Sequence, residues 1–353
     1  MRQPSLFELL KKCDSTTNQP PSGELELYEY FAGAGGFSTG AAQAGCRVVY
    51  ACDSCPLALE THRRNHPKTE HQCVELPARE AVAKLPTDGR RFHVHCSPPC
   101  VKLSRMNRCN EAMSNRGASG LDRARDMVEW SLEMMLASAC TSWSLEQVSD
   151  RQALEVVERV RCRHPRRVAY AAIDLSLLGV PQNRMRLIVA PPKLLARLLR
   201  KCAKTRVRTM RDVIPAPRGT HVRRGQSWID KRLRLNRKPG ETKYVCTRAD
   251  WADNCRSLDR PAPTVRARHA HTWVTVRNNK AVDHTVLSPR ELATLQTFPE
   301  TYKLPVRKFD AYLQVGNAVP PLVAKLLLEE EVAAARPASP SLRRAQRSPQ
   351  WTP

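Results

Sequence analysis

The chain has 353 residues, 41% of them hydrophobic, and a formal net charge of +24. Its length allows one large or two modest domains, and so large an excess of positive charge favours a polyanionic partner. The apolar runs are too short to span a membrane, and the first residues lack the apolar core of a secretory signal. The sequence therefore disfavours membrane and secreted proteins and predicts an intracellular one.

Short apolar runs alternate with helix-like stretches over the first half of the chain. The strand candidates are 24–33, 46–53, 91–100, 139–148, 166–174 and 185–190, and the helix candidates are 36–45, 56–65, 121–138 and 150–162. This alternation predicts an α/β fold with a doubly wound, mostly parallel sheet covered on both faces. Ligands of such sheets bind beyond the carboxyl ends of the strands.

The first glycine-rich stretch, FAGAGGFSTG (31–40), follows a predicted strand and opens a predicted helix. Gly33, Gly35 and Gly36 would let a ligand approach the backbone near the free N–H groups of that helix, although many tight glycine turns bind nothing. The next predicted strand ends at Asp53, whose carboxylate could accept both hydroxyls of a ribose. Together these features predict a nucleoside-bearing cofactor, and the missing GxxxxGK[ST] pattern disfavours a triphosphate.

A cysteine follows two prolines in HCSPPC (95–100). The prolines make a stiff, non-helical turn, which suits a nucleophile, whereas a lone cysteine is more often a buried structural residue. The residues expected around this cysteine favour a nucleophile over a structural residue. Glu146 ends another strand candidate, and Arg184 and Arg186 are spaced to share one face of an extended strand. A thiol at Cys100, an acid and two guanidiniums are thus expected around one cleft.

The remaining cysteines are predicted to be reduced thiols without a metal. The chain has 13 cysteines, an odd number, and no export signal, so disulfides are disfavoured. Cys52 and Cys55 form a single CxxC pair, and no second pair lies at the spacing of a zinc finger. We therefore expect no metal site.

A change in composition marks the region after residue 190. Residues 193–238 contain sixteen Lys or Arg and only two acids, Asp212 and Asp230. Long apolar runs are rare there, which predicts a small basic region separate from the sheet. The last residues, 333–353, are polar and proline-rich, as is typical of disordered tails.

The order of these motifs, from about residue 27 to 328, resembles the cytosine-5 DNA methyltransferase family. FAGAGGFSTG resembles its cofactor loop, SPPCVKLS its nucleophile loop and GVPQNRMR its Gln-x-Arg-x-Arg motif, while RPAPTV, LSPRELATLQTFP and GNAVPP resemble its closing motifs. The resemblance implies a class I, Rossmann-like methyltransferase with a small basic target-recognition domain. The implied segments are an N-terminal extension (1–24), a catalytic and cofactor-binding domain (25–192), a basic target-recognition region (193–259), a return to the catalytic domain (260–332) and the tail (333–353).

The resemblance also implies the reaction and its participants. A monomer would transfer a methyl group from S-adenosyl-L-methionine to C5 of a cytosine flipped out of double-stranded DNA, in the nucleus or the nucleoid. Cys100 would add to C6, Glu146 would bind N3, and Arg184 or Arg186 would stabilise O2. The implied donor-binding residues are Phe31, Ala32, Gly33, Gly35, Gly36, Asp53, Ser54, Pro99, Asn317 and Val319.

Four positions depart from the family pattern. Val101 replaces Gln, Gln147 replaces Asn in a Glu-Asn-Val motif, Phe92 replaces a frequent Asp, and Cys73 replaces an Asp that often contacts adenine.

Two alternatives remain open beside an active enzyme that methylates DNA. One is the same chemistry on tRNA, which the stretch YVCTRADW faintly suggests, and the other is a catalytically inactive DNA-binding regulator.

Overall fold

The computed structural model describes residues 24–99, 117–217, 220–221, 243–247, 255–267, 271–277 and 280–334. The predicted nucleophile Cys100 and the neighbouring Val101 lie outside the described residues. So do the predicted N-terminal extension up to residue 23, residues 218–219 and 222–238 of the basic segment, and the tail from residue 335. Within the described ranges, no helix combines the length and the hydropathy needed to cross a bilayer.

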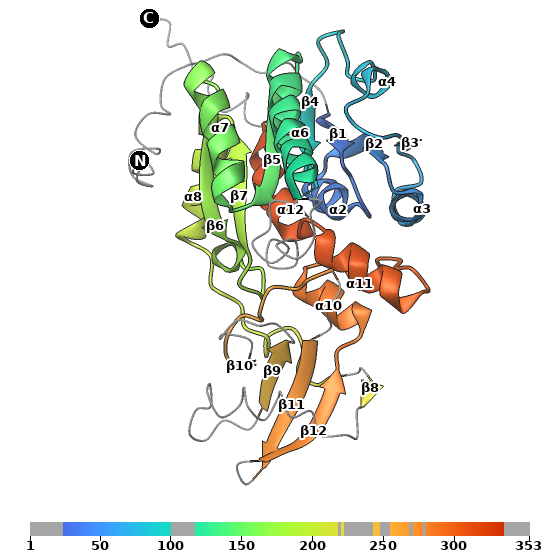
Figure 1. The fold of residues 1–353 in the computed structure, drawn as a ribbon, viewed down its shortest axis with the longest axis vertical. Helices are drawn as coiled ribbons and strands as arrows, with labels where there is room; N and C mark the ends of the chain where they lie inside the picture. Colours follow the sequence, from blue (N-terminus) through green and yellow to red (C-terminus); the bar gives the residue numbers. More distant parts are fainter. Residues whose placement is uncertain are drawn as a thin grey trace, which may run out of the picture.

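A seven-stranded sheet forms the larger part of the molecule (Figure 1). Its order is β3-β2-β1-β4-β5-β7-β6, in which β3, β2, β1, β4 and β5 are parallel and β7 runs antiparallel to both its neighbours. The strands are β1 (Glu26–Tyr30), β2 (Arg47–Asp53), β3 (Glu70–Cys73), β4 (Phe92–Cys96), β5 (Ser142–Val148), β6 (Ala169–Asp174) and β7 (Met185–Ala190). The predicted mostly parallel sheet is confirmed.

Helices cover both faces of this sheet, which makes it doubly wound. The helices of this part are α2 (Gly36–Ala44), α3 (Pro56–Asn65), α4 (Arg79–Val82), α6 (Gly117–Ala137), α7 (Arg151–Arg163), the 3-10 helix η1 (Leu175–Leu178), α8 (Pro192–Cys202) and α12 (Pro321–Ala333). One core joins α6 and α7 to side chains such as Tyr30 and Val94. The opposite core joins α2, α8 and α12 to side chains such as Leu27 and Ile188.

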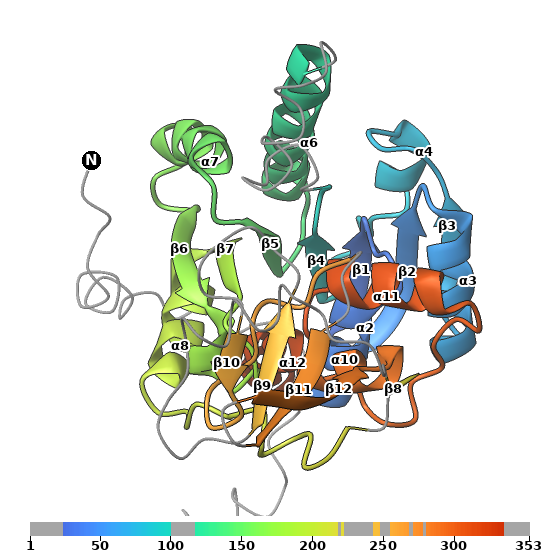
Figure 2. The same cartoon turned by 60° about the horizontal axis from the view of Figure 1, so that its bottom comes forward.

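A second, five-stranded antiparallel sheet forms a smaller unit, which Figure 2 turns toward the viewer. Its strands are β8 (Thr220–His221), β9 (Lys243–Thr247), β10 (Cys255–Ser257), β11 (His271–Arg277) and β12 (Lys280–Val286). The helices α10 (Pro289–Leu295) and α11 (Lys308–Asn317) lie between the two sheets in Figure 1. A third core joins Trp273 of β11 to Leu292 of α10 and Val315 of α11.

The boundaries of the two units differ from the predicted ones. Residues 193–202 belong to α8, whose leucines Leu194, Leu195, Leu198 and Leu199 are buried in the core of the large sheet. The helix is amphipathic, so its lysines and arginines lie on the other face and do not mark a separate region. At the other end, residues 271–286 still pair within the small sheet, and α12 brings the chain back to the large one.

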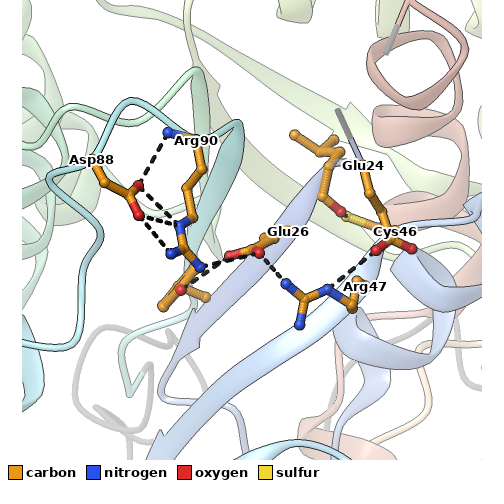
Figure 3. Close-up of polar contacts among 8 residues, drawn as sticks. Glu24, Glu26, Cys46, Arg47, Asp88 and Arg90 are labelled. Atoms are coloured by element: carbon orange, nitrogen blue, oxygen red, sulfur yellow. Dashed lines mark hydrogen bonds and ion pairs between the residues drawn. The ribbon is translucent and has the colours of Figure 1, made fainter. Parts of the chain in front are cut away.

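Charged residues form ion pairs with one another at the amino-terminal edge of the large sheet (Figure 3). Glu26, the first residue of β1, pairs with Arg47 at the start of β2 and with Arg90 just before β4. Arg90 also pairs with Asp88 at 2.5 Å. The Tyr28 hydroxyl donates to Glu26 at 3.1 Å, and burial raises the pKa of Tyr28 to about 12. These side chains bind one another, and the predicted ligand residues lie at the opposite, carboxyl edge.

Candidate active site

The loop between β1 and α2 exposes its backbone at the carboxyl edge of the sheet. Phe31 and Gly33 have φ angles of 57° and 53°, a left-handed conformation that only glycine adopts without steric cost. A Cβ atom on Gly33 would meet nothing within 4 Å. The backbone at Gly33 therefore has open space beside it, and its predicted contact with a cofactor stays a prediction.

Two further glycines of this motif are needed for packing. A Cβ on Gly36 would lie 2.2 Å from the carbonyl oxygen of Val319, and one on Gly40 would lie 1.8 Å from that of Pro321. These glycines let α2 approach the turn that begins α12. A Cβ on Gly35 would lie 2.8 Å from Cδ2 of His62. Packing alone explains why Gly35 and Gly36, both predicted to contact the cofactor, carry no side chain.

Asp53 ends β2 beside the glycine loop. Its Oδ2 accepts a hydrogen bond from the Gly33 N–H and its Oδ1 accepts one from the Cys55 N–H, both at 2.8 Å. Burial raises the pKa of Asp53, and the N–H donors oppose that effect. The Ser54 N–H also contributes a hydrogen bond to this carboxylate, so three backbone donors leave about one of its four lone pairs for a ligand hydroxyl. The acid is thus held at the position where a ribose is expected.

The other residues predicted to contact the methyl donor differ in exposure. Ser54, Pro99 and Asn317 are exposed, whereas Ala32 and Val319 are buried. The Phe31 ring meets Trp130 of α6 edge-on, with 6.4 Å between centroids. The thiol of Cys73, the position that departs from the family pattern, lies 3.9 Å from the Ser54 carbonyl oxygen.

Glu146 and Arg186 form an ion pair between neighbouring strands. The distance from Arg186 Nε to Glu146 Oε1 is 2.7 Å, and the two side chains are 13% and 12% exposed. Because β7 is antiparallel to β5, its first residues lie at the carboxyl end of β5, where Arg186 pairs with Val148. The structure therefore brings together the acid and one of the two predicted guanidiniums.

Arg184 extends into the interior instead. It is 2% exposed, and its guanidinium donates to the carbonyl oxygens of Val265 at 2.9 Å, Gly316 at 3.1 Å and Ala318 at 3.2 Å. These contacts join the start of β7 to two of the predicted closing motifs. The two arginines therefore have different surroundings, although they are two residues apart in the sequence.

Gln147 holds the turn that precedes Cys100. Its side chain is fully buried, its Nε2 donates to the Pro98 carbonyl at 3.0 Å, and its Oε1 accepts from the Val148 N–H at 2.8 Å. The Ser97 hydroxyl donates to the Phe31 carbonyl at 3.1 Å, which ties the same turn to the glycine loop. In the sequence, Gln147 stands out only because it replaces the Asn of the family's Glu-Asn-Val motif. Its contact with Pro98, 49 residues away, could not be read from the pattern.

The described residues also answer whether a metal site is present. In the part of the chain that the structure describes, no group of three or more His, Cys, Asp or Glu is arranged to hold a metal ion.

Comparisons with known proteins extend the motif evidence over most of the chain. The sequence matches the family model described as C-5 cytosine-specific DNA methylase over residues 25–122 and 167–332. It is 25% identical to type II methyltransferase M.HgiDI of Herpetosiphon aurantiacus, covering 84% of this chain and 90% of that protein. It is 22% identical to type II methyltransferase M.HindV of Haemophilus influenzae, covering 86% and 95%.

Solved structures share the fold at lower identity. The S. pombe Dnmt2 methyltransferase aligns with a TM-score of 0.61 at 17% identity, covering 88% of this chain and 99% of that one. The Entamoeba histolytica methyltransferase EhMeth aligns with a TM-score of 0.54 at 13% identity, with the same coverage. These two likenesses support the methyltransferase fold.

Proposed function

The chain belongs to the C-5 cytosine-specific DNA methylase family and is a DNA cytosine-5 methyltransferase, and from this premise we propose how its residues carry out the reaction. The observation that carries the proposal is the Glu146–Arg186 pair, which lies at the same sheet edge as the turn held by Gln147. That turn leads directly into Cys100. Since the substrate is DNA, we propose that the protein acts inside the cell.

The glycine loop and Asp53 fit S-adenosyl-L-methionine as the methyl donor. The open space at Gly33 admits the amino acid end of this molecule, and the Asp53 carboxylate, which keeps room for a hydroxyl donor, suits its ribose. The donor would supply an electrophilic methyl group carried on a sulfonium. We propose that the remaining contacts come from Phe31, Ala32, Gly35, Gly36, Ser54, Pro99, Asn317 and Val319.

We propose that Cys100 starts the reaction by adding to C6 of the cytosine. A thiolate is a soft and strong nucleophile, and its addition makes C5 electron-rich enough to accept a methyl group. Once C5 is methylated, loss of the C5 proton to a base restores the double bond, and the thiolate leaves with the electrons of the C–S bond. The two pyrrolidine rings before Cys100 and the Gln147 contact would keep the thiol in place.

Charge that develops on the ring needs partners at N3 and O2. Glu146 would bind N3 and the amino group, and Arg186 would donate to O2. Their ion pair orients both groups before the base arrives, which lowers the cost of arranging them during the reaction. Arg184, with its guanidinium on three backbone carbonyls, would act as a positioning residue for the closing motifs.

The target base must leave the duplex, because C6 cannot be reached inside the base stack. Flipping costs about a few kcal/mol, and contacts between basic side chains and phosphates can offset it. Lys204, Arg206 and Arg208 are exposed members of the basic segment. We propose that this segment and the small sheet bind the duplex beside the flipped base.

Bisulfite sequencing of a plasmid after expression of the protein tests the proposed function. We expect cytosines protected from conversion at one recurring sequence context, and no protection with the Cys100→Ser variant. Complete conversion, with methyl transfer to tRNA in a parallel assay, would favour the tRNA substrate. Complete conversion without transfer to either nucleic acid would favour the inactive DNA-binding regulator.

A further inference from the structure

The small sheet contacts the segment before β7 through the side chain of Arg256. Arg256 lies on β10, and its Nη1 donates a hydrogen bond to Oδ1 of Asn183. In Figures 1 and 2, β10 is the edge strand of the small sheet on the side toward β6 and β7. Asn183 precedes by three residues Arg186, whose guanidinium we propose for O2 of the cytosine. The contact therefore connects the unit proposed to bind the duplex with the strand that carries Arg186.

The Asn183 amide is fixed from its other end as well. Its Nδ2 donates to Asp174 Oδ2 at 2.6 Å and to Ser176 Oγ at 3.3 Å, so its Oδ1 is the atom that faces Arg256. With a cation beside the amide oxygen and a carboxylate beside the amide nitrogen, each hydrogen bond polarises the amide in the sense that strengthens the other. A row of three side chains, Arg256, Asn183 and Asp174, thus extends from the small sheet into the large one.

Asp174 in turn holds the backbone that leads into β7. Its Oδ1 accepts a hydrogen bond from the Arg184 N–H at 3.0 Å. In the sheet register Asp174 lies opposite Met185, the residue before Arg186. The Arg186 guanidinium then pairs with Glu146 at 2.7 Å. A shift of β10 relative to the large sheet would therefore change the direction in which Arg186 points.

We propose that Arg256 is a positioning residue, which places Arg186 for catalysis when DNA binds to the small sheet. The inference rests on the proposed role of Arg186 and on the proposed duplex site. Arg256 would touch neither the cytosine nor the methyl donor and would act through Asn183. A misplacement of about 1 Å can lower a rate about a hundredfold. Loss of the contact should therefore slow methyl transfer while both ligands still bind.

Other contacts hold the two units together without Arg256. Gln182 and Ala262 form an isolated parallel bridge, and the Asn183 N–H donates to the Ala262 carbonyl at 2.9 Å. The Thr264 hydroxyl donates to the Asn183 carbonyl at 2.6 Å. Arg256 itself is partly exposed. An Arg256 variant should therefore fold, with the Asn183 side chain released from the small sheet.

Single-turnover methyl transfer by the full chain tests the inference. The substrate is a duplex with the sequence context that bisulfite sequencing identifies. Duplex and S-adenosyl-L-methionine are both saturating, so the rate reports the step after binding. We expect Arg256→Met to lower this rate by about tenfold to a hundredfold. Its affinity for the duplex, by fluorescence anisotropy, and for S-adenosyl-L-homocysteine, by calorimetry, should match the wild type. A merely structural role would instead weaken both affinities and lower the melting temperature.

Three further variants sharpen the test. Arg256→Lys keeps a cationic donor for Asn183 and should recover part of the rate. Arg159→Met is the matched control and should keep the wild-type rate. Arg159 also joins two elements, α7 and α6, through Glu129 at 2.8 Å, but these helices carry none of the proposed site residues. The double variant Arg256→Met/Asn183→Ala should be no slower than Asn183→Ala alone, because both changes remove the same contact.

A wild-type rate with Arg256→Met would overturn the inference. Weaker duplex binding with a wild-type rate at saturation would also do so, because Arg256 would then bind a phosphate. If the two losses multiply in the double variant, Arg256 does not act through Asn183. Should Arg256→Met not fold, Arg256→Gln has a side chain shorter than arginine and should show the same slow transfer, and a wild-type rate would again contradict the proposal. A wild type that transfers no methyl group to DNA would refute the proposed function, and this inference with it.

Discussion

Replacing Arg184 with methionine should destabilise the fold strongly, because three buried carbonyls would lose this donor, and of these the Ala318 carbonyl keeps a hydrogen bond from Gln296 at 3.3 Å. These are the carbonyls of Val265, Gly316 and Ala318, at 2.9 to 3.2 Å. A hydrogen bond from a charged donor contributes about 1.5–3 kcal/mol, and a buried carbonyl left unpaired costs about 1–3 kcal/mol. Removing the buried guanidinium recovers part of its desolvation cost, so we expect a net loss of about 3–5 kcal/mol.

Arg186→Met is the matched control for this prediction. Arg186 has a comparable side chain two residues further along, but it lies at the edge and pairs with Glu146. We expect it to lower the melting temperature by only a few degrees and to abolish methyl transfer, whereas Arg184→Met should lower it by about 10 °C. Thermal melting followed by circular dichroism measures both. An Arg184→Met protein that melts within about 2 °C of the wild type would refute the structural role of Arg184, and equal melting of the two variants would refute the distinction between them.

Three further predictions follow from the same geometry. Gly36→Ala should cost about 1–3 kcal/mol, since its Cβ would overlap the Val319 carbonyl; an unchanged denaturation midpoint would contradict that packing. Asp53→Ala should weaken S-adenosyl-L-homocysteine binding at least tenfold by calorimetry while leaving DNA affinity nearly unchanged, and equal affinity for the ligand would remove Asp53 from the site. Acid should destabilise the protein as pH falls from 6.5 toward 4. Burial lowers the pKa of His62 to about 4 and of His93 to about 3, so the unfolded chain binds protons that the folded one excludes. A melting temperature equal at pH 7 and pH 5 would contradict this.

The sequence predicted the large sheet well, because buried parallel strands and amphipathic helices leave clear local patterns. It missed β3, which consists of three polar residues and a cysteine and has no apolar run. It also placed α8 in the basic region, since the positive charge of that segment obscured its buried leucines. Both errors arise where local composition and burial disagree.

The candidate site was predictable in its residue types and less so in their contacts. Asp53 and Gly33 could be paired because strand ends meet at one edge of a parallel sheet. Arg184 and Arg186 look equivalent in the sequence. Their roles differ because residue 265 and residues 316–318, which are distant in the chain, fold back to place their carbonyls beside the Arg184 guanidinium. The contact that Glu29 of β1 makes with the first turn of α2 was not predictable. Its carboxylate accepts a hydrogen bond from the Ser38 N–H at 3.0 Å, and the side chains of Ser38 and His62 come from two helices that meet only in the folded chain.

The covalent step at Cys100 is the central claim of the mechanism, and duplex DNA that carries 5-fluorocytosine at the methylated position tests it most directly. Cys100 should add to C6 and methyl transfer should follow. The thiolate cannot then leave, because fluorine cannot depart as a cation in place of the C5 proton. We predict a protein–DNA adduct that survives denaturing electrophoresis, requires S-adenosyl-L-methionine and is absent with Cys100→Ser. An enzyme that methylates normal DNA but never forms this adduct would contradict the mechanism.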